Sequence, residues 1–438
     1  SASNRLDVLE GYLAENLRRA SSAKDERYVE KPHKRLDADK LSVRLLAFYL
    51  PQFHPIPEND EWWGKGFTEW TNVSKATAQF VGHYQPHLPG ELGFYDLRLP
   101  EVMRQQVDLA KHFGIGGFCF YYYWFGGRRL LERPLQMFLE NPGLDIGFCY
   151  CWANENWSRR WDGLEDSILL AQQHSPEDDI AFIDALADAF RDPRYVRVDG
   201  KPLLIVYQVA LLPDAAATAQ RWRRRVIELG FDGIHLVAAK TFDMIDVSRY
   251  GFDAVVEFPP HQTAMQDISG EFQALNPEFR GRIYDFEELA KRFGKEDRSD
   301  QLLYKTVMPS WDNDARKPGA GHTFVNATPR VYAAWLADAC RVTASRALPD
   351  HRMLFVNAWN EWAEGAHLEP DRRWGYAYLD ATARVLSRYY RDPELNDRLQ
   401  AHNAGFVKRH DAAVVVHLYF EDLYDELFER YLRDAAVD

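Results

Sequence analysis

Short apolar runs recur along the chain, and each one is followed by loop residues and then by a segment with helical spacing. Runs that are apolar almost throughout are typical of parallel strands buried on both faces. The predicted strands are residues 45–50, 117–122, 146–151, 203–207, 234–239, 254–258, 306–309 and 353–358. About eight strands that alternate with helices are expected of a (β/α)8 barrel, so we predict an α/β protein with a TIM-barrel fold over residues 41–392. An open doubly wound sheet is the alternative, but no G-x-G-x-x-G motif follows the first strand.

Helix start and stop signals lie between these runs. Pro100 can occupy the first turn of a helix that Gly114 ends. Ser175 and Thr328 each precede a proline, which is the order that an N-cap residue and a first-turn proline require. The signals therefore predict helices where the barrel pattern needs them.

Two segments lie outside the predicted barrel. Residues 1–40 contain one amphipathic helix, at 6–17, and then a charged stretch, so we expect an N-terminal helical arm or linker. In residues 393–438, a strand-like run at 413–419 precedes a helical pattern at 421–432. One strand and one helix cannot bury a core of their own. This C-terminal extension is therefore expected to pack on the barrel or to open a further, truncated domain.

The chain of 438 residues carries 53 Lys and Arg against 66 Asp and Glu, a net charge of −13, and it has no long basic cluster. This balance argues against nucleic acid and anionic membranes as partners. No apolar run is long enough to span a membrane, and no signal-peptide pattern follows the polar N-terminus. The 4 cysteines are too few for a disulfide framework in a chain of this size. We expect a cytoplasmic protein, or a periplasmic one if a signal peptide has been removed.

Aromatic residues make up 14% of the chain, and they gather at the ends of predicted strands. Active sites of such barrels lie at the carboxyl ends of the strands, and flat rings with polar edges suit sugars, although a bulky core is the alternative explanation. The residues expected to bind sugar are Tyr49, His54, Trp63, Glu69, Trp70, Trp152, Asn154, Glu155, Trp157, Trp359, Asn360 and Trp362. For Glu155 the alternative is neutralisation by Arg159 or Arg160, and Glu69 could equally be a solvated loop charge.

Two carboxylates three residues apart, Glu361 and Glu364, follow the last predicted strand among tryptophans. Cleavage of a glycosidic bond needs one proton donor and one base or nucleophile, and an apolar wall raises the pKa of a donor. We therefore predict these two glutamates as the catalytic residues. The alternative is that both cap the following helix and pair with Arg372 or Arg373.

No metal site and no cofactor are expected. His54 has no second histidine near it after the first strand, so the metal-binding pair of many hydrolase barrels is missing. The Asp-x-Asp sequence at 312–314 could hold a divalent metal, but Trp311 and Arg316 beside it fit a sugar-binding rim or a salt-bridged loop equally well.

Four longer motifs carry a resemblance to a known family. Residues 48–55, 63–73, 152–157 and 359–365 read FYLPQFHP, WGKGFTEWTNV, WANENW and WNEWAEG. They resemble the WbsX family, also described as glycoside hydrolase family 99-like, over about 45–380. The resemblance implies a bacterial protein encoded among surface-polysaccharide genes, including O-antigen and lipopolysaccharide clusters, whose members have often been labelled glycosyltransferases. The related family-99 endo-α-mannosidases are (β/α)8 barrels that cleave within chains and retain configuration without a metal.

The family-99 signature near the last strand is Asn-Glu-Trp-His-Glu-Gly, and residues 360–365 read Asn-Glu-Trp-Ala-Glu-Gly. The resemblance implies that Glu361 removes the proton from the sugar 2-hydroxyl, which gives a 1,2-anhydro sugar. It implies that Glu364 protonates the leaving group and then activates water. Ala363 replaces the family histidine, which bears on the sugar recognised more than on the carboxylate chemistry. Glu155 is similar in position to a third pocket acid.

The function expected from the residues and the resemblance is a retaining, metal-independent and endo-acting glycoside hydrolase, whose substrate is a bacterial surface polysaccharide or oligosaccharide. A non-catalytic glycan-binding module and a glycosyltransferase in polysaccharide biosynthesis are the alternatives. Residues 414–420 are similar to the start of rhamnan-synthesis-type domains, which implies fused or associated glycosyltransferase domains as partners.

Overall fold

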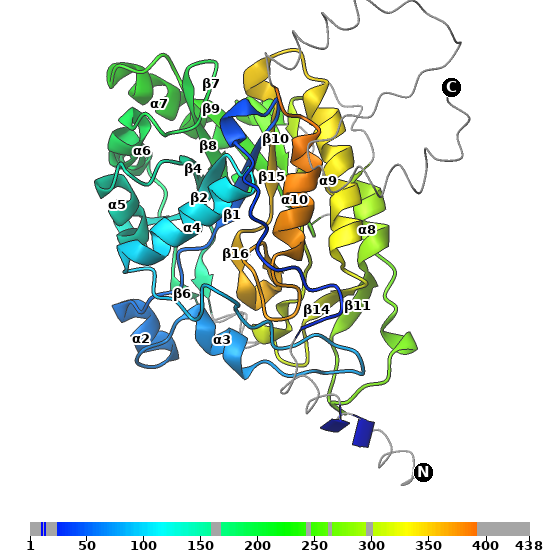
Figure 1. Ribbon diagram of the computed structural model, residues 1–438. Coiled ribbons are helices and arrows are strands. Elements are labelled where there is room, and N and C mark those ends of the chain that lie inside the picture. Colours follow the sequence, from blue (N-terminus) through cyan, green and yellow to red (C-terminus); the bar gives the residue numbers. More distant parts are fainter. Residues whose placement is uncertain are drawn as a thin grey trace, which may run out of the picture.

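Figure 1 shows the computed structural model of the chain, which describes residues 10–11, 13–14, 24–158, 168–241, 247–261, 265–294 and 301–391. Within the predicted N-terminal helix, the described residues 10–11 and 13–14 are helical. The predicted C-terminal strand at 413–419 and helix at 421–432 lie outside the described residues, as do Arg159 and Arg160. No helix of the described part of the chain is both long enough and apolar enough to cross a membrane.

A parallel sheet that curls into a barrel forms the centre of the molecule. Its strands are β1 (Arg44–Tyr49), β2 (Gly117–Phe125), β4 (Gly147–Trp152), β8 (Lys201–Val206), β9 (His235–Lys240), β10 (Ala254–Glu257), β12 (Leu303–Tyr304), β13 (Thr306–Val307) and β15 (Met353–Val356). They are hydrogen-bonded in the order β12-β10-β9-β8-β4-β2-β1-β15-β13. Residues 303–307 join the two ends of the sheet, because β12 pairs with β10 and β13 pairs with β15. The predicted (β/α)8 barrel is confirmed, with 303–307 as its seventh strand.

Each predicted strand overlaps an observed one, and the largest difference is at β2. This strand continues to Phe125 and turns back into β3 (Arg128–Leu130) as an antiparallel hairpin. Gly126 and Gly127 form the turn with φ angles of 54° and 87°. Two successive residues with positive φ make the two-residue turn that matches strand twist, and glycine adopts that conformation without steric cost. A second hairpin joins β7 (Arg197–Val198) to β8.

The helices cover the barrel, with α4 to α7 along one side and α8 to α10 along the other (Figure 1). Their bounds are α4 (Pro100–His112), α5 (Glu132–Glu140), α6 (Pro176–Arg191), α7 (Ala215–Glu228), α8 (Phe286–Phe293), α9 (Pro329–Ala344) and α10 (Ala377–Ser387). The predicted caps form: Ser175 Oγ accepts the backbone N–H of Asp178 at 3.0 Å, and Thr328 Oγ1 accepts that of Val331 at 3.3 Å. These bonds satisfy helix-terminal N–H groups and so set where α6 and α9 begin.

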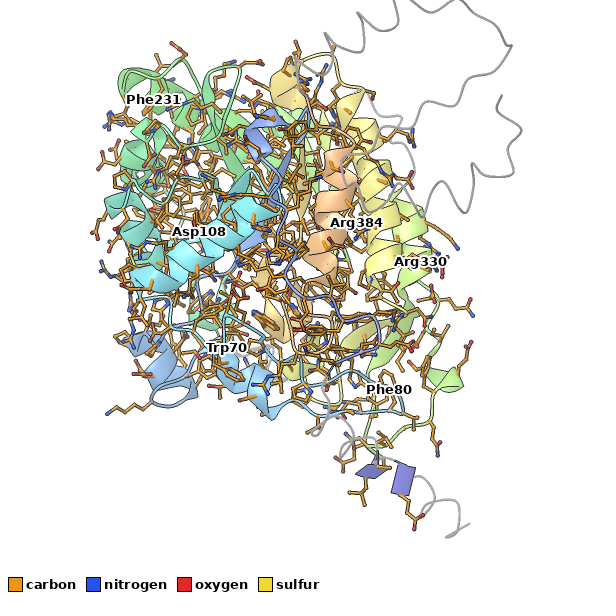
Figure 2. The ribbon with its side chains drawn as sticks, viewed as in Figure 1. Trp70, Phe80, Asp108, Phe231, Arg330 and Arg384 are labelled. Carbon is orange, nitrogen blue, oxygen red and sulfur yellow. The ribbon has the colours of Figure 1, made fainter. Side chains whose placement is uncertain are left out.

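The loops at the carboxyl ends of the strands build a separate layer, at the bottom of the view in Figure 1. It contains α2 (Pro57–Trp63), α3 (Glu69–Lys75), β5 (Trp157–Ser158), β6 (Ile168–Leu170), β11 (Arg282–Asp285), β14 (His322–Val325), β16 (Asn360–Glu361) and β17 (Ala366–His367). Short 3-10 helices complete the described structure: η1 (Ala38–Lys40), η3 (Val209–Leu211), η4 (Val247–Tyr250), η5 (Ser269–Glu271), η6 (Asn313–Ala315), η7 (Pro349–His351) and η8 (Trp362–Glu364). Trp70 of α3 and Phe80 both lie in this layer (Figure 2). Since barrel enzymes carry their sites at this end, the layer is where a site is expected.

Candidate functional site

A cavity of about 620 Å³ opens in the layer of loops, within the usual size range of ligand sites. Several strands of the barrel contribute to it through the residues at their carboxyl ends. Its lining includes Gln52, Trp62, Trp63, Phe67, Glu69, Lys75, Tyr121, Tyr123, Glu155, Trp157, Tyr207, Phe258, His261, Trp311, Asn313, Arg316, Lys317, Glu361 and Glu364. The cavity therefore combines aromatic walls with a small number of charged groups.

Glu361 and Glu364 both line this cavity, and the turn after β15 positions them. Glu361 ends β16, which pairs with β17 in antiparallel orientation, and Glu364 ends η8 between these two strands. Gly365 then takes a φ of 62°, and a Cβ there would lie 3.0 Å from the backbone nitrogen of Asp312. Glycine is needed at this position for both reasons, and it lets the chain turn directly after Glu364.

Asn360 and Trp362 stabilise this turn through hydrogen bonds to the interior of the protein. Asn360 accepts the backbone N–H of Leu50 at 2.7 Å and donates to the Leu50 carbonyl at 3.0 Å. Trp362 donates its indole N–H to Glu369 at 2.7 Å, and its ring stacks on His367 with 3.7 Å between centroids. Both side chains are buried. They orient the neighbouring glutamates and do not themselves line the cavity.

One arginine contacts three carboxylates of the cavity. Arg316 Nη2 lies 2.9 Å from Glu361 Oε2, Nη1 contacts Glu364 Oε1, and Nε lies 3.3 Å from Glu69 Oε2. The expected alternative partners bond elsewhere: Arg372 donates to the Pro89 carbonyl, and Arg373 pairs with an aspartate of the N-terminal segment. Glu361 and Glu364 therefore form a salt-bridged cluster inside the cavity, with an arginine that neither of them neighbours in sequence.

Burial controls the protonation of these acids. Desolvation raises the pKa of Glu361 to about 8, against the opposing pull of the Arg316 charge and with further support from the nearby carboxylates. The pKa of Glu364 is also raised, again because burial disfavours the ionised form. A single guanidinium cannot neutralise three buried carboxylates. The pair Glu361 and Glu364 therefore holds a proton near neutral pH, which a general acid requires.

Aromatic rings surround the acids on several sides. Trp62 and Trp157 lie edge to face with centroids 5.6 Å apart, and Trp157 also contacts Tyr123 at 5.5 Å. Tyr207 shares a hydrogen bond of 3.0 Å with His261. Burial lowers the pKa of His261 to about 4, so its imidazole is neutral at pH 7. Rings with hydroxyl and imidazole edges offer stacking for sugar C–H faces and hydrogen bonds for hydroxyls.

The structure divides the residues expected to bind sugar into two groups. Those that line the cavity are Trp63, Glu69, Glu155 and Trp157, and those that do not are Tyr49, His54, Trp70, Trp152, Asn154, Trp359, Asn360 and Trp362. The members of the second group are all buried, and most have protein partners: Tyr49 donates to Gln106, and Trp70 donates to the Tyr95 carbonyl. These side chains therefore belong to the packed interior and not to the cavity wall.

Several cavity residues were not predicted as site residues. Tyr121 and Tyr123 come from β2, whose run of aromatic residues indicated only a buried strand. Their spacing of two, which puts both side chains on one face, was the available signal. The sequence shows Arg316 beside 312–314, but it does not indicate that this arginine contacts Glu361 and Glu364. No local pattern links residues so far apart. Glu155 accepts a hydrogen bond from Gln208, another partner that sequence spacing does not reveal.

In the part of the chain that the structure describes, possible metal ligands occur in two groups, and neither group includes Glu361 or Glu364. Asp312 accepts from Thr323 and pairs with His83 at 2.6 Å, so its carboxylate is already engaged within the protein. His87, His367 and Asp371 offer ligand atoms that all lie within 4.8 Å of one another and are buried. The two histidines share a hydrogen bond of 3.0 Å.

A barrel with two carboxyl groups in an aromatic cavity at the carboxyl ends of its strands is a glycoside hydrolase-like architecture. Residues 45–382 match the family described as glycosyltransferase WbsX, and the chain belongs to this family. The uncharacterized protein WxcX of Xanthomonas campestris pv. campestris strain B100 is 47% identical over 391 residues, which cover 89% of this chain and 55% of the relative. The chain thus spans about half the length of such curated relatives.

Two solved structures share the fold. The GH99 endo-alpha-mannosidase from Bacteroides thetaiotaomicron matches with a TM-score of 0.51 and 15% identity, covering 79% of this chain and 97% of the enzyme. A glycoside hydrolase-like protein matches with a TM-score of 0.50 and 15% identity, covering 82% of this chain and 98% of that one. The expected resemblance to the WbsX family and to family-99 barrels is confirmed at the level of family and fold.

Proposed function

We propose that the chain is a retaining, metal-independent glycoside hydrolase that cleaves within a bacterial surface polysaccharide such as an O-antigen. One observation carries the proposal: Glu361 and Glu364 line the same aromatic cavity and bind the same guanidinium. Two carboxyls on neighbouring nitrogens of one guanidinium are close together, as the roughly 5–9.5 Å separations of glycosidase acids require.

The two glutamates have different exposure, which suits different roles. The Glu361 side chain is 6% exposed, and that of Glu364 is 20% exposed. In the reacting state the proton of the pair lies on Glu364, so Glu361 at the deeper position is ionised and removes the proton from the sugar 2-hydroxyl as O2 attacks C1. Glu364, nearer the opening, donates its proton to the departing glycosidic oxygen as the C1–O bond breaks.

Water then opens the 1,2-anhydro sugar. Glu364 takes a proton from the water whose oxygen attacks C1, and Glu361 returns its proton to O2. Each of the two steps inverts C1, so the overall reaction retains configuration, and both glutamates end in their starting protonation states. No step needs a metal or a cofactor.

Charge in the cavity favours hydrolysis over transfer from a nucleotide sugar, which the family description would suggest. The charged side chains that line the cavity, among the residues described, are Glu69, Glu155, Glu361, Glu364, Lys75, Arg316 and Lys317. The one guanidinium among them, that of Arg316, is already bound by three of the four acids. A diphosphate placed here would meet repulsion from these acids. Asp312 and Asp314 were the candidates for holding a divalent metal with a nucleotide sugar. Each of them accepts a hydrogen bond from a backbone N–H group.

The proposed setting is the bacterial cytoplasm, with glycosyltransferase domains fused or associated. Cys119, Cys149, Cys151 and Cys340 are all free and buried, which suits a reducing compartment. The chain covers 55% of the length of its curated relatives, which leaves room in such proteins for further domains.

The test is incubation with the surface polysaccharide of the source bacterium, followed by mass spectrometry of the fragments and NMR of their anomeric configuration. Glu361→Gln and Glu364→Gln should each lower the rate by about 10²–10⁴-fold, the usual contribution of acid–base catalysis. Glu278→Gln, an exposed glutamate outside the cavity, is the matched control. Full turnover by both cavity variants would refute the proposal. Tight glycan binding without any product would instead favour the non-catalytic binding module.

A further inference from the structure

We infer that Arg316, backed by Glu69, is a positioning residue that fixes both reacting carboxyls and sets the charge that acts on them. This inference rests on the proposed function, because it assigns to Glu361 and Glu364 the roles of base and acid. It adds a residue from the loop after the seventh strand and one from the loop after the first strand.

The first step is geometric. Each nitrogen of the Arg316 guanidinium contacts a different acid, and the Arg316 side chain is only 9% exposed. A guanidinium is planar and its donors have fixed directions, so two carboxylates bound to it cannot move independently. A lysine would supply the same charge as a single point and would leave the relative orientation of Glu361 and Glu364 undefined.

The second step concerns how Arg316 itself is held. It directly follows η6, and the residue before η6, Asp312, donates its backbone N–H to the Glu364 carbonyl at 2.7 Å. The Asp312 carboxylate binds His83 at 2.6 Å and Thr323 at 3.1 Å. Ser310 donates its hydroxyl to the Gly365 carbonyl. The loop that carries the arginine and the loop that carries Glu364 are therefore joined by one main-chain hydrogen bond and one hydrogen bond from a serine side chain, independently of the salt bridges.

The third step concerns Glu69, which is 1% exposed. Its Oε2 contacts Arg316 at 3.3 Å, whereas its buried Oε1 has no hydrogen-bond partner among the described residues, although Glu69 lines the cavity. A buried carboxylate oxygen without a donor is costly, and a sugar hydroxyl would satisfy it. Glu69 thus has one oxygen for the arginine and one for a ligand.

The charges explain why both partners are needed. Three ionised carboxylates around one arginine would bury a net charge of −2, which desolvation opposes, so the cluster keeps a proton. Without Arg316, burial would favour protonation of both Glu361 and Glu364, and the base would be lost. Without Glu69, the full charge of Arg316 would act on the pair and favour ionisation of both, and the acid would be lost.

Other titratable groups face the cluster, and the variants of Arg316 and Glu69 leave them unchanged. They are Tyr121, Tyr123, Glu155, Tyr207 and Lys317. Burial keeps the pKa of Tyr121 and Tyr207 well above 10, so these phenols stay neutral over the range in which the acids titrate. Opposite responses to loss of Arg316 and of Glu69 therefore cannot come from these two phenols.

The test is a substrate-free titration by infrared spectroscopy, which detects protonated carboxyl groups. Difference spectra against Glu361→Gln and Glu364→Gln assign the bands, which is necessary because burial also raises the pKa of Glu369, to about 7. Arg316→Met should move the titration of the pair upward by about one pH unit or more, and Glu69→Gln should move it downward, since a charge at this distance shifts a pKa by roughly 1–3 units. Arg330→Met, an exposed arginine at the start of α9, should leave it unchanged (Figure 2).

Shifts in the same direction, or no shift in either variant, would overturn the inference. If Arg316→Met does not fold, Glu69→Gln still tests the sign, and Arg316→Lys should keep the titration near that of the native protein. Where cleavage is measured, Arg316→Lys should lower kcat by tenfold or more with little change in the pH profile, and unchanged kcat would refute the positioning role. The titration needs no substrate, so failure of this inference and failure of the proposed hydrolysis remain distinguishable.

Discussion

Replacing Glu361 by glutamine is expected to stabilise the fold at alkaline pH while it lowers activity by about 10²–10⁴-fold. Glutamine has nearly the same shape, and its carbonyl oxygen can still accept from Arg316, whose remaining contacts with Glu69 and Glu364 are unchanged. What the variant loses is a buried negative charge. The native protein has to bear the cost of that charge whenever Glu361 is ionised.

The magnitude follows from the pKa of Glu361, which is raised from 4.5 to about 8. A folded-state pKa above the unfolded value means that the contribution to stability is fully present below pH 4.5. It is lost as the pH rises through 8. At 1.36 kcal/mol for each pKa unit, the interval corresponds to about 5 kcal/mol at most. Because Glu361 and Glu364 titrate as a pair, part of this cost is shared, and we expect a gain of about 2 kcal/mol or more at pH 9.

The assay is urea unfolding of both proteins at several values between pH 5 and pH 9. Near pH 5 the two free energies of unfolding should be similar, and the difference should grow in favour of Glu361→Gln as the pH rises. The m-values should stay equal, which shows that the variant unfolds from the same compact state. A variant that is less stable than the native protein at pH 9, or a difference that does not change with pH, would refute the reasoning.

Two further predictions concern the cavity wall and the barrel interior. Trp157→Ala removes a half-buried ring that lines the cavity, so glycan affinity measured by calorimetry should fall by roughly tenfold, about 1.4 kcal/mol, whereas the thermal midpoint should barely change. Lys305→Met leaves Glu257 without its buried partner, since Lys305 Nζ binds both Glu257 and the Phe293 carbonyl. We expect the free energy of unfolding in urea to fall by about 3–5 kcal/mol, and to be largely recovered in the double variant with Glu257→Leu. A loss below about 1 kcal/mol would contradict the role of Lys305 as the partner that Glu257 needs in the interior.

The barrel could be predicted because its strands are buried on both faces and so appear in the sequence as unbroken apolar runs. The hairpin of β2 and β3 was not predicted, since the aromatic run 117–125 continues without any polar residue and only Gly126 and Gly127 mark its turn. The layer of loops was harder to predict. Two tryptophans in one motif, Trp152 and Trp157, lie in different environments. Trp152 packs on Phe182 in the interior, and Trp157 lines the cavity. Composition alone cannot predict which tryptophan lines the cavity, because this depends on where the strand ends and the loop begins.

The meeting of Glu69, Arg316 and Glu361 has a topological cause that local sequence patterns do not contain. These residues follow β1, β13 and β15, and the sheet order makes these three strands consecutive neighbours. The first and the last two strands of a closed barrel must lie side by side, so their carboxyl-end loops share one part of the rim whatever their separation in sequence. Polar residues after strands one, seven and eight of such a chain are therefore the ones to test for mutual contact first. Which of these polar residues form salt bridges depends on loop geometry. Here the geometry is set by the hydrogen bond from the backbone N–H of Asp312 to the backbone carbonyl of Glu364.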